Sequence, residues 1–180
     1  FLNLSFVQRA FVAGSFIAAL CAVLGLFLVL RRMSMIGDGL SHVSFGAIAL
    51  GLLIGVYPYY AAVPIVIIAS LLILSITEKA RLFGDAAIGI VSAVGISMGV
   101  VLASISGGFN VDLMSYLFGN ILTISRIELI ISIVLSVIVF LVVYLFYYDL
   151  FSSTFDSEYA NTTGISTNLV NRILVVLTSI

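Results

Sequence analysis

Long stretches without charge alternate with short charged segments along this chain. No charged residue lies between Arg9 and Arg31. A membrane-spanning helix needs about 20 consecutive apolar residues, so the pattern predicts a first span at about residues 10–30. Two later apolar stretches predict spans at about residues 86–104 and 129–148.

Residues 39–77 also carry no charge when histidine is counted as neutral, but this stretch is too long for a single crossing. The run Tyr57-Pro58-Tyr59-Tyr60 divides it, because proline interrupts a helix and tyrosine favours the lipid–water boundary. We therefore predict two spans, at about residues 39–56 and 61–77.

Two shorter apolar segments complete the pattern. Residues 113–125 are too few to cross a bilayer, which favours a partial or re-entrant helix. Residue 1 is Phe, and residues 173–180 stop partway into an apolar run, so we expect a piece of a longer protein that is incomplete at its C-terminus. The predicted fold is all-α: a polytopic transmembrane helix bundle with about six to seven membrane helices, forming a single domain over residues 1–180.

Composition supports a membrane environment. Hydrophobic residues make up 63% of the chain, charged residues 8%, and the mean hydropathy is +1.35. A soluble domain carries about 25% charged residues. The net charge of −1 leaves no basic patch for nucleic acid, and a single cysteine, Cys21, excludes an internal disulfide.

Basic residues suggest an orientation in the membrane. Arg31-Arg32 and the segment 78–81 are separated by two predicted spans, so they face the same side. Cytoplasmic loops carry an excess of Lys and Arg, which places both segments in the cytoplasm and Arg9 and Arg126 outside. The polar segment 149–165 is then also cytoplasmic.

Small residues recur at a spacing of four within the predicted spans. In lipid this spacing lets two helix backbones approach closely. We expect such contacts at three pairs: Ala10/Gly14, Gly51/Gly55 and Gly95/Gly99.

Asp38 and His42 are the residues most able to carry chemistry. They are four positions apart, so they share one face of a helix. A carboxylate and an imidazole together suit zinc, manganese or iron(II). The same spacing also fits a hydrogen-bonded pair that locks helices together, or a proton relay. We expect Gly37 and Gly39 to loosen the start of this helix and to expose its backbone near the pair.

The polar segment 149–165 predicts a short helix between two spans. Ser152-Ser-Thr-Phe-Asp156 offers candidate N-caps with acidic residues following, and Gly164 can end the helix. Such a helix is either a simple connector or a contact for a partner. The printed chain contains no G-x-x-x-x-G-K-[ST] motif, so we expect ATP hydrolysis, if required, on another subunit.

One motif resembles a known family. The run Leu30-Arg-Arg-Met-Ser-Met-Ile-Gly-Asp-Gly-Leu-Ser-His42 closely resembles the signature of the zinc/manganese ABC transporter permeases. The resemblance continues at residues 8–10, 117–122 and 155–160 and spans nearly the whole chain. Gly39 stands where alanine is usual, and Ser157 stands where proline is common.

The resemblance implies a permease subunit of an ATP-driven importer for zinc, manganese or iron, with an arrangement like that of type II ABC importers. It implies that Asp38 and His42 coordinate the transported metal, with no permanently bound cofactor. The implied partners are a cytoplasmic ABC ATPase, an extracytoplasmic metal-binding protein, a second copy of the permease in a homodimer, and membrane lipid. Asp156, Glu158, Ala160 and Gly164 then lie at or near the contact with the ATPase. The expected location is the prokaryotic cytoplasmic membrane, with several spans.

Three alternatives stay open at this point. The chain is a permease for a chelated metal or corrinoid, a proton-coupled secondary transporter, or a structural or sensing membrane subunit without a pathway. In each case the protein is not itself an enzyme.

Overall fold

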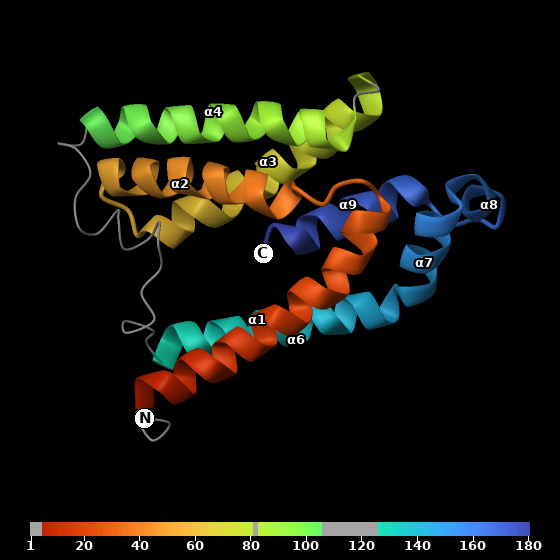
Figure 1. Ribbon diagram of the computed structural model, residues 1–180, viewed down its shortest axis with the longest axis horizontal. Helices are drawn as coiled ribbons and strands as arrows, with labels where there is room; N and C mark the ends of the chain where they lie inside the picture. Colours follow the sequence, from red (N-terminus) through yellow and green to blue (C-terminus); the bar gives the residue numbers. More distant parts are fainter. Residues whose placement is uncertain (1–4, 81–82, 106–125) are drawn as a thin grey trace. The chain divides into compact units, whose positions relative to one another are not determined.

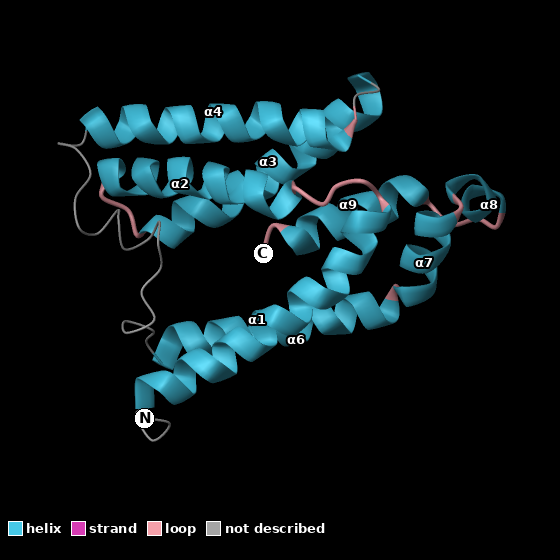
Figure 2. Cartoon of the chain, viewed as in Figure 1, coloured by secondary structure: helices cyan, strands magenta, loops and turns pink. Residues whose placement is uncertain are grey.

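The structure, a computed structural model, describes residues 5–80, 83–105 and 126–180, and the secondary structure of these residues is helical, without strands (Figure 2). The helices follow one another as α1 (Ser5–Leu30), α2 (Ile36–Ile54), α3 (Pro58–Ala80), α4 (Gly84–Ile105), α6 (Arg126–Leu145), α7 (Tyr147–Phe155), α8 (Ser157–Thr162) and α9 (Thr167–Thr178) (Figure 1). The predicted all-α fold is confirmed.

The predicted spans correspond to helices of the structure. Among the described residues, α1 to α4 are long and apolar enough to cross a membrane, and α6 with α7 adds a fifth span if the two form one broken helix. Each of the five predicted spans falls on one of these helices. The apolar run that begins at residue 173 belongs to α9, a shorter apolar helix. The predicted partial helix at residues 113–125 lies outside the described residues.

The chain divides into two compact units. One consists of residues 1–30 and 120–170, and the other of residues 31–119 and 171–180. The expectation of a single domain stays a prediction.

In the first unit, α1 packs along α6 (Figure 1). The buried apolar side chains of this unit include Phe27 of α1 and Val139 and Val143 of α6. Ser136 of α6 is buried too, at 1% exposed.

In the second unit, α2 and α3 form a helical hairpin. Gly55 ends α2 with a left-handed backbone, φ +75°, and its N–H donates to the carbonyl oxygen of Leu52. Glycine adopts this conformation without the steric cost that a Cβ would add. Pro58 then opens α3, where its missing N–H costs nothing. The predicted break at Tyr57-Pro58 is confirmed.

Helices α2 and α4 approach each other unusually closely, through glycine. A Cβ added at Gly95 would lie 2.7 Å from the Cα of Val43, and one added at Gly46 would lie 2.6 Å from the carbonyl oxygen of Gly95. A Cβ added at Gly99 would likewise clash with the ring of Phe45, at 2.5 Å. The predicted close contact at Gly95/Gly99 is therefore confirmed, because there is no room for a side chain between the two backbones.

The other two small-residue pairs behave differently. Gly51 does lie against α3, at Pro58 and Ala61. Its predicted partner Gly55 instead caps the helix, and a Cβ at Gly14 would meet nothing within 4 Å among the described residues.

Charged residues before α2 and near the end of α3 lie together in the second unit. The Arg31 guanidinium donates to the side-chain oxygen of Asn171, whose amide nitrogen lies 3.5 Å from Glu78 Oε1. The start of α4 is adjacent, because a Cβ at Gly84 would come 2.9 Å from the carbonyl oxygen of Arg32. Arg31-Arg32 and Glu78 thus lie at one end of the unit, as predicted, whereas Arg81 is outside the described residues. That this end is cytoplasmic stays a prediction.

Candidate functional site: an acidic residue and a histidine on α2

The chain enters α2 through a tight turn. Arg32 adopts a left-handed backbone, φ +58°, which is uncommon for a residue with a Cβ. The Ile36 N–H then bonds the Met33 carbonyl oxygen at 3.1 Å, and both of these side chains are buried. This anchored turn fixes where the first turn of α2 begins, and Asp38 lies in that turn. A carboxylate there is favoured by the positive end of the helix dipole.

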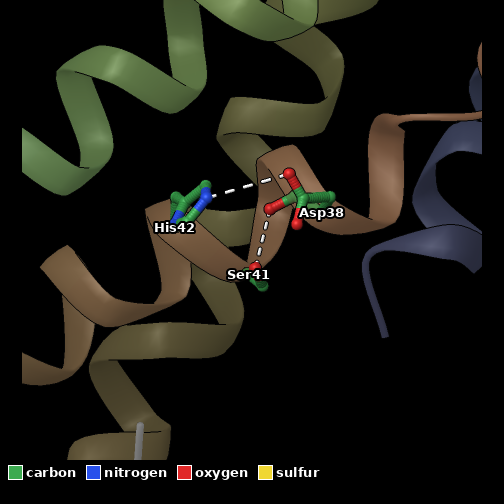
Figure 3. A network of polar contacts seen from close by, with 3 residues as sticks. All are labelled: Asp38, Ser41 and His42. Atoms are coloured by element: carbon green, nitrogen blue, oxygen red, sulfur yellow. Dashed lines mark hydrogen bonds and ion pairs between the residues drawn. The ribbon is translucent and has the colours of Figure 1, made fainter.

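Asp38 and His42 lie side by side on α2 (Figure 3). His42 Nε2 is 3.8 Å from Asp38 Oδ2, which is too long for a direct hydrogen bond. The Asp38 side chain is 65% exposed and that of His42 is 38% exposed. The prediction that they share one helix face is confirmed, and neither side chain is buried in this unit.

Ser41 is the third residue of this polar group. Its hydroxyl donates to the backbone carbonyl oxygen of Asp38 at 2.7 Å (Figure 3). It therefore bonds the helix backbone rather than either of the two candidate ligands.

The opposite side of this helix turn is buried against α4. A Cβ at Gly39 would lie 2.5 Å from Cγ2 of Ile88, which is itself 3% exposed. The expectation that Gly39 exposes the helix backbone is wrong, because Gly39 is buried and leaves room for the Ile88 side chain. Gly37 does face open space, with nothing within 4 Å of an added Cβ.

The pair has no third ligand in the part of the chain that the structure describes. No group of three His, Cys, Asp or Glu side chains lies close enough there to hold a metal ion. A carboxylate oxygen and an imidazole nitrogen match divalent transition metals by ligand type. Two such ligands give a partial coordination shell, with water or other groups needed to complete it.

The second unit also contains an apolar cavity, which is chemically unsuited to an ion. It has a volume of about 260 Å³ and lies between α2, α3 and α4, where apolar side chains such as Leu50, Ile76 and Val94 line it. An ion there would lose its hydration without gaining ligands. The exposed pair on α2, rather than this cavity, is the candidate metal site.

The predicted cytoplasmic segment forms two helices instead of one. The chain bends by 66° between α6 and α7. Ser153 and Thr154, expected among the N-caps, lie inside α7, where both hydroxyls donate back to the Leu150 carbonyl oxygen. Serine and threonine hydroxyls make such bonds within helices, so this part of the N-cap prediction is wrong.

Asp156 is the N-cap of the second helix, α8. Its Oδ1 accepts from the backbone N–H groups of Glu158, at 3.1 Å, and of Tyr159, at 2.9 Å. Ser157 then takes the first helical position, where proline would also fit. The departure from proline therefore does not prevent the helix from starting.

The end of α8 also follows the prediction. Gly164 has φ +88°, its N–H donates to the Asn161 carbonyl oxygen, and the Ile165 N–H donates to that of Ala160. These two bonds form a Schellman motif, which requires a left-handed residue at this position.

The four residues named for a partner contact thus differ in what they expose. Ala160 is fully buried, Asp156 is occupied as a cap and Gly164 forms the turn, so these three shape the segment. Glu158 is exposed, and so is Tyr159, at 62%. Glu158 and Tyr159 are therefore the two side chains of α8 considered below as a contact surface, and Tyr159 was not among the residues named from the sequence.

Replacing Asp156 by alanine is expected to loosen α8. Losing an N-cap costs about 0.5–2 kcal/mol, and a helix of 6 residues has little else to hold its first turn. Hydrogen exchange at the amides of Glu158 and Tyr159 should accelerate in Asp156→Ala and stay near the wild-type rate in Asp156→Asn, which keeps an accepting oxygen. Equal exchange in the two variants would show that the cap does not hold the helix.

Comparisons with known proteins agree with this architecture. The family model described as the ABC 3 transport family matches residues 3–180. A manganese transport system membrane protein, MntC of Halalkalibacterium halodurans, is 34% identical over 179 residues, which are 99% of this chain and 61% of that protein. The high-affinity zinc uptake system membrane protein ZnuB of Haemophilus influenzae is 35% identical over 67% of this chain and 46% of that protein.

A solved structure has the same fold. PsaBC from Streptococcus pneumoniae, in complex with Fab, matches with a TM-score of 0.78 and 27% sequence identity, over 98% of this chain and 65% of that chain. The chain therefore spans about three fifths or less of the length of the curated relatives named here. The match over residues 3–180 and the apolar helices identify a multi-pass membrane protein, and the chain belongs to the ABC 3 transport family.

Proposed function

We propose that the full-length protein is the membrane-spanning permease subunit of an ATP-driven importer that carries manganese or zinc into the cell. Family membership supports a transport subunit. The printed names of the relatives, which include manganese and zinc transport proteins, support a divalent transition metal as substrate.

The observation that carries this proposal is the exposed pair on α2. Asp38 Oδ2 and His42 Nε2 lie 3.8 Å apart, on side chains that are 65% and 38% exposed. A cation that contacts both atoms exchanges part of its hydration shell for one carboxylate oxygen and one imidazole nitrogen. A partial shell suits transport, because the ion has to leave again. The choice between manganese and zinc is not made by these two ligands, which serve both.

The other subunits of the proposed importer are separate chains. We infer a cytoplasmic ATPase as the source of energy, an extracytoplasmic metal-binding protein as the source of the ion, and a second permease copy. In this proposal α8 and its flanking residues dock on the ATPase, with Glu158 and Tyr159 on the contact surface. Asp156, Ala160 and Gly164 hold that surface in shape.

Uptake by reconstituted vesicles tests the proposal. The full-length permease and its proposed ATPase partner are placed in sealed vesicles, with radioactive manganese(II) or zinc(II) and the metal-binding protein on the outer side. We expect uptake that requires ATP and persists when a protonophore collapses the proton gradient.

Three outcomes would contradict this function. Uptake without the ATPase that stops with the protonophore would identify a proton-coupled carrier. Uptake of a chelate or corrinoid, but not of the free ion, would identify a different permease class. No uptake of either, with correctly inserted protein, would favour a sensing or structural subunit.

A further inference from the structure

A row of aromatic rings covers one side of α7. Tyr147, Tyr148, Phe151 and Phe155 form this aromatic face. The ring centroid of Tyr147 lies 5.7 Å from that of Tyr148 and 6.1 Å from that of Phe151. The ring centroids of Phe151 and Phe155 lie 4.5 Å apart. At about 100° of rotation per residue, the four positions cover an arc of about 100° of the helix surface.

The aromatic face points away from the unit that contains α7. The side of α7 that packs inward is marked by Leu150, which is fully buried, and by Ser153. Tyr148 is 81% exposed and Phe155 is 64% exposed, although both rings are large and mostly apolar. Four exposed aromatic residues in a helix of 9 residues are unfavourable in water, so another surface has to receive them.

The position of α7 in the chain identifies that surface as lipid. α7 follows the apolar helix α6 directly, and the 66° bend turns it away from the direction of that span. The last residues of α6, Tyr144 and Leu145, are 80% and 66% exposed, so large exposed side chains occur on both sides of the bend. A bilayer that covers the exposed end of α6 also receives the adjoining aromatic face, whereas a soluble partner of α7 would leave the end of α6 uncovered.

The chemistry of α7 also fits the boundary of the bilayer rather than its centre. Tyrosine is enriched at the lipid–water interface, where the ring is in apolar surroundings and the hydroxyl reaches water. Asp149 and Ser152 lie on the remaining side of α7, between the aromatic face and the buried side, where they can meet water or lipid headgroups.

We propose that α7 is an interfacial helix that lies along the membrane surface, with its aromatic face inserted at the level of the lipid headgroups. This assignment goes beyond the transport function and does not depend on which substrate is carried. Because Asp156 joins α7 directly to α8, an anchored α7 holds the segment proposed to contact the ATPase at the membrane surface.

The absence of tryptophan from the printed sequence makes a direct test possible, provided that any tryptophan elsewhere in the full-length protein is first replaced by phenylalanine. Single variants Tyr148→Trp and Phe155→Trp place a fluorophore on the aromatic face. Tyr159→Trp on α8, at a residue of similar exposure, is the matched control, and Ile138→Trp in the middle of α6 is the deep reference. The full-length protein is measured in phosphatidylcholine vesicles whose acyl chains carry bromine either near the carbonyl end or near the methyl end.

Both aromatic-face variants should lose most of their fluorescence to shallow bromine and less to deep bromine. Ile138→Trp should show the reverse order, and Tyr159→Trp should be quenched mainly by aqueous iodide. The proposal is overturned if Tyr148→Trp and Phe155→Trp resist both brominated lipids. It is equally overturned if their emission changes only when the ATPase is added, or only with protein concentration, since the face would then bind a protein. Two variants on one face keep the test valid if one of them fails to insert.

Discussion

Replacing His42 by alanine is expected to abolish metal uptake while the protein still inserts into the membrane. His42 is the only histidine in the printed sequence, so no other imidazole in it can take its place. Losing even an outer partner of a metal ligand costs about 10–100-fold, and losing the ligand itself should reduce the initial uptake rate by at least that amount. Radioactive manganese or zinc uptake, normalised to the amount of permease in the membrane, measures the effect.

Asp38→Asn separates the metal role from a purely structural one. The asparagine keeps the size of the side chain and one oxygen but removes the charge that binds a cation. A 3.8 Å contact between exposed side chains contributes about 1 kcal/mol or less to stability. A structural pair therefore predicts near-normal uptake for Asp38→Asn, whereas the metal role predicts a loss similar to that of His42→Ala.

Ser41→Ala is the matched control for both variants. Ser41 lies on the same helix turn, and its hydroxyl bonds only the Asp38 backbone oxygen among the contacts described above. Its uptake should stay close to that of the wild-type protein. Normal uptake by His42→Ala would refute the proposed site, and uptake that becomes sensitive to a protonophore would point to proton transfer instead.

Gly95→Ala is expected to destabilise the second unit strongly. The added methyl group would lie 2.7 Å from the Cα of Val43, so α2 and α4 have to move apart. Overfilling a well-packed contact costs about 1–3 kcal/mol. The clash is with backbone, which cannot rotate aside, so we expect the upper part of this range.

Gly89→Ala is the control, on the same helix and of the same chemical change. A Cβ at Gly89 meets nothing within 4 Å among the described residues, and alanine favours the helix more than glycine does. Thermal unfolding of the full-length protein in detergent should show a lower midpoint for Gly95→Ala and an unchanged or higher one for Gly89→Ala. Equal midpoints would mean that the close approach of α2 and α4 is not needed. Because Asp38 and His42 are on α2, Gly95→Ala should also reduce uptake.

The two ends of α8 depend on residues close to each other in the sequence. Asp156 and Gly164 were identifiable from sequence because an N-cap and a left-handed stop act within a few residues. The position of Ser153 and Thr154 was misjudged for a different reason. A serine or threonine can either cap a helix or bond the carbonyl oxygen of the preceding turn. Because α7 extends to residue 155, Ser153 and Thr154 lie inside it and make the second kind of bond.

The role of Gly39, beside the candidate metal site, depends on a residue distant in the sequence. Its neighbours along the chain suggested a flexible helix start, but its role is set by Ile88, which is 49 positions away and fills the space that a side chain would take. No local pattern contains that information.

The sequence by itself determined the membrane spans and the shared face of Asp38 and His42. A bilayer excludes charge over a fixed thickness, and a helix repeats every 3.6 residues, so both properties depend on spacing alone. Only the tertiary structure decided which glycines separate α2 from α4, which side of α7 is exposed, and that Ala160 is buried. These depend on residues distant in the chain that meet in space, and the free energy of close helix contact in lipid comes from the fit of the two surfaces.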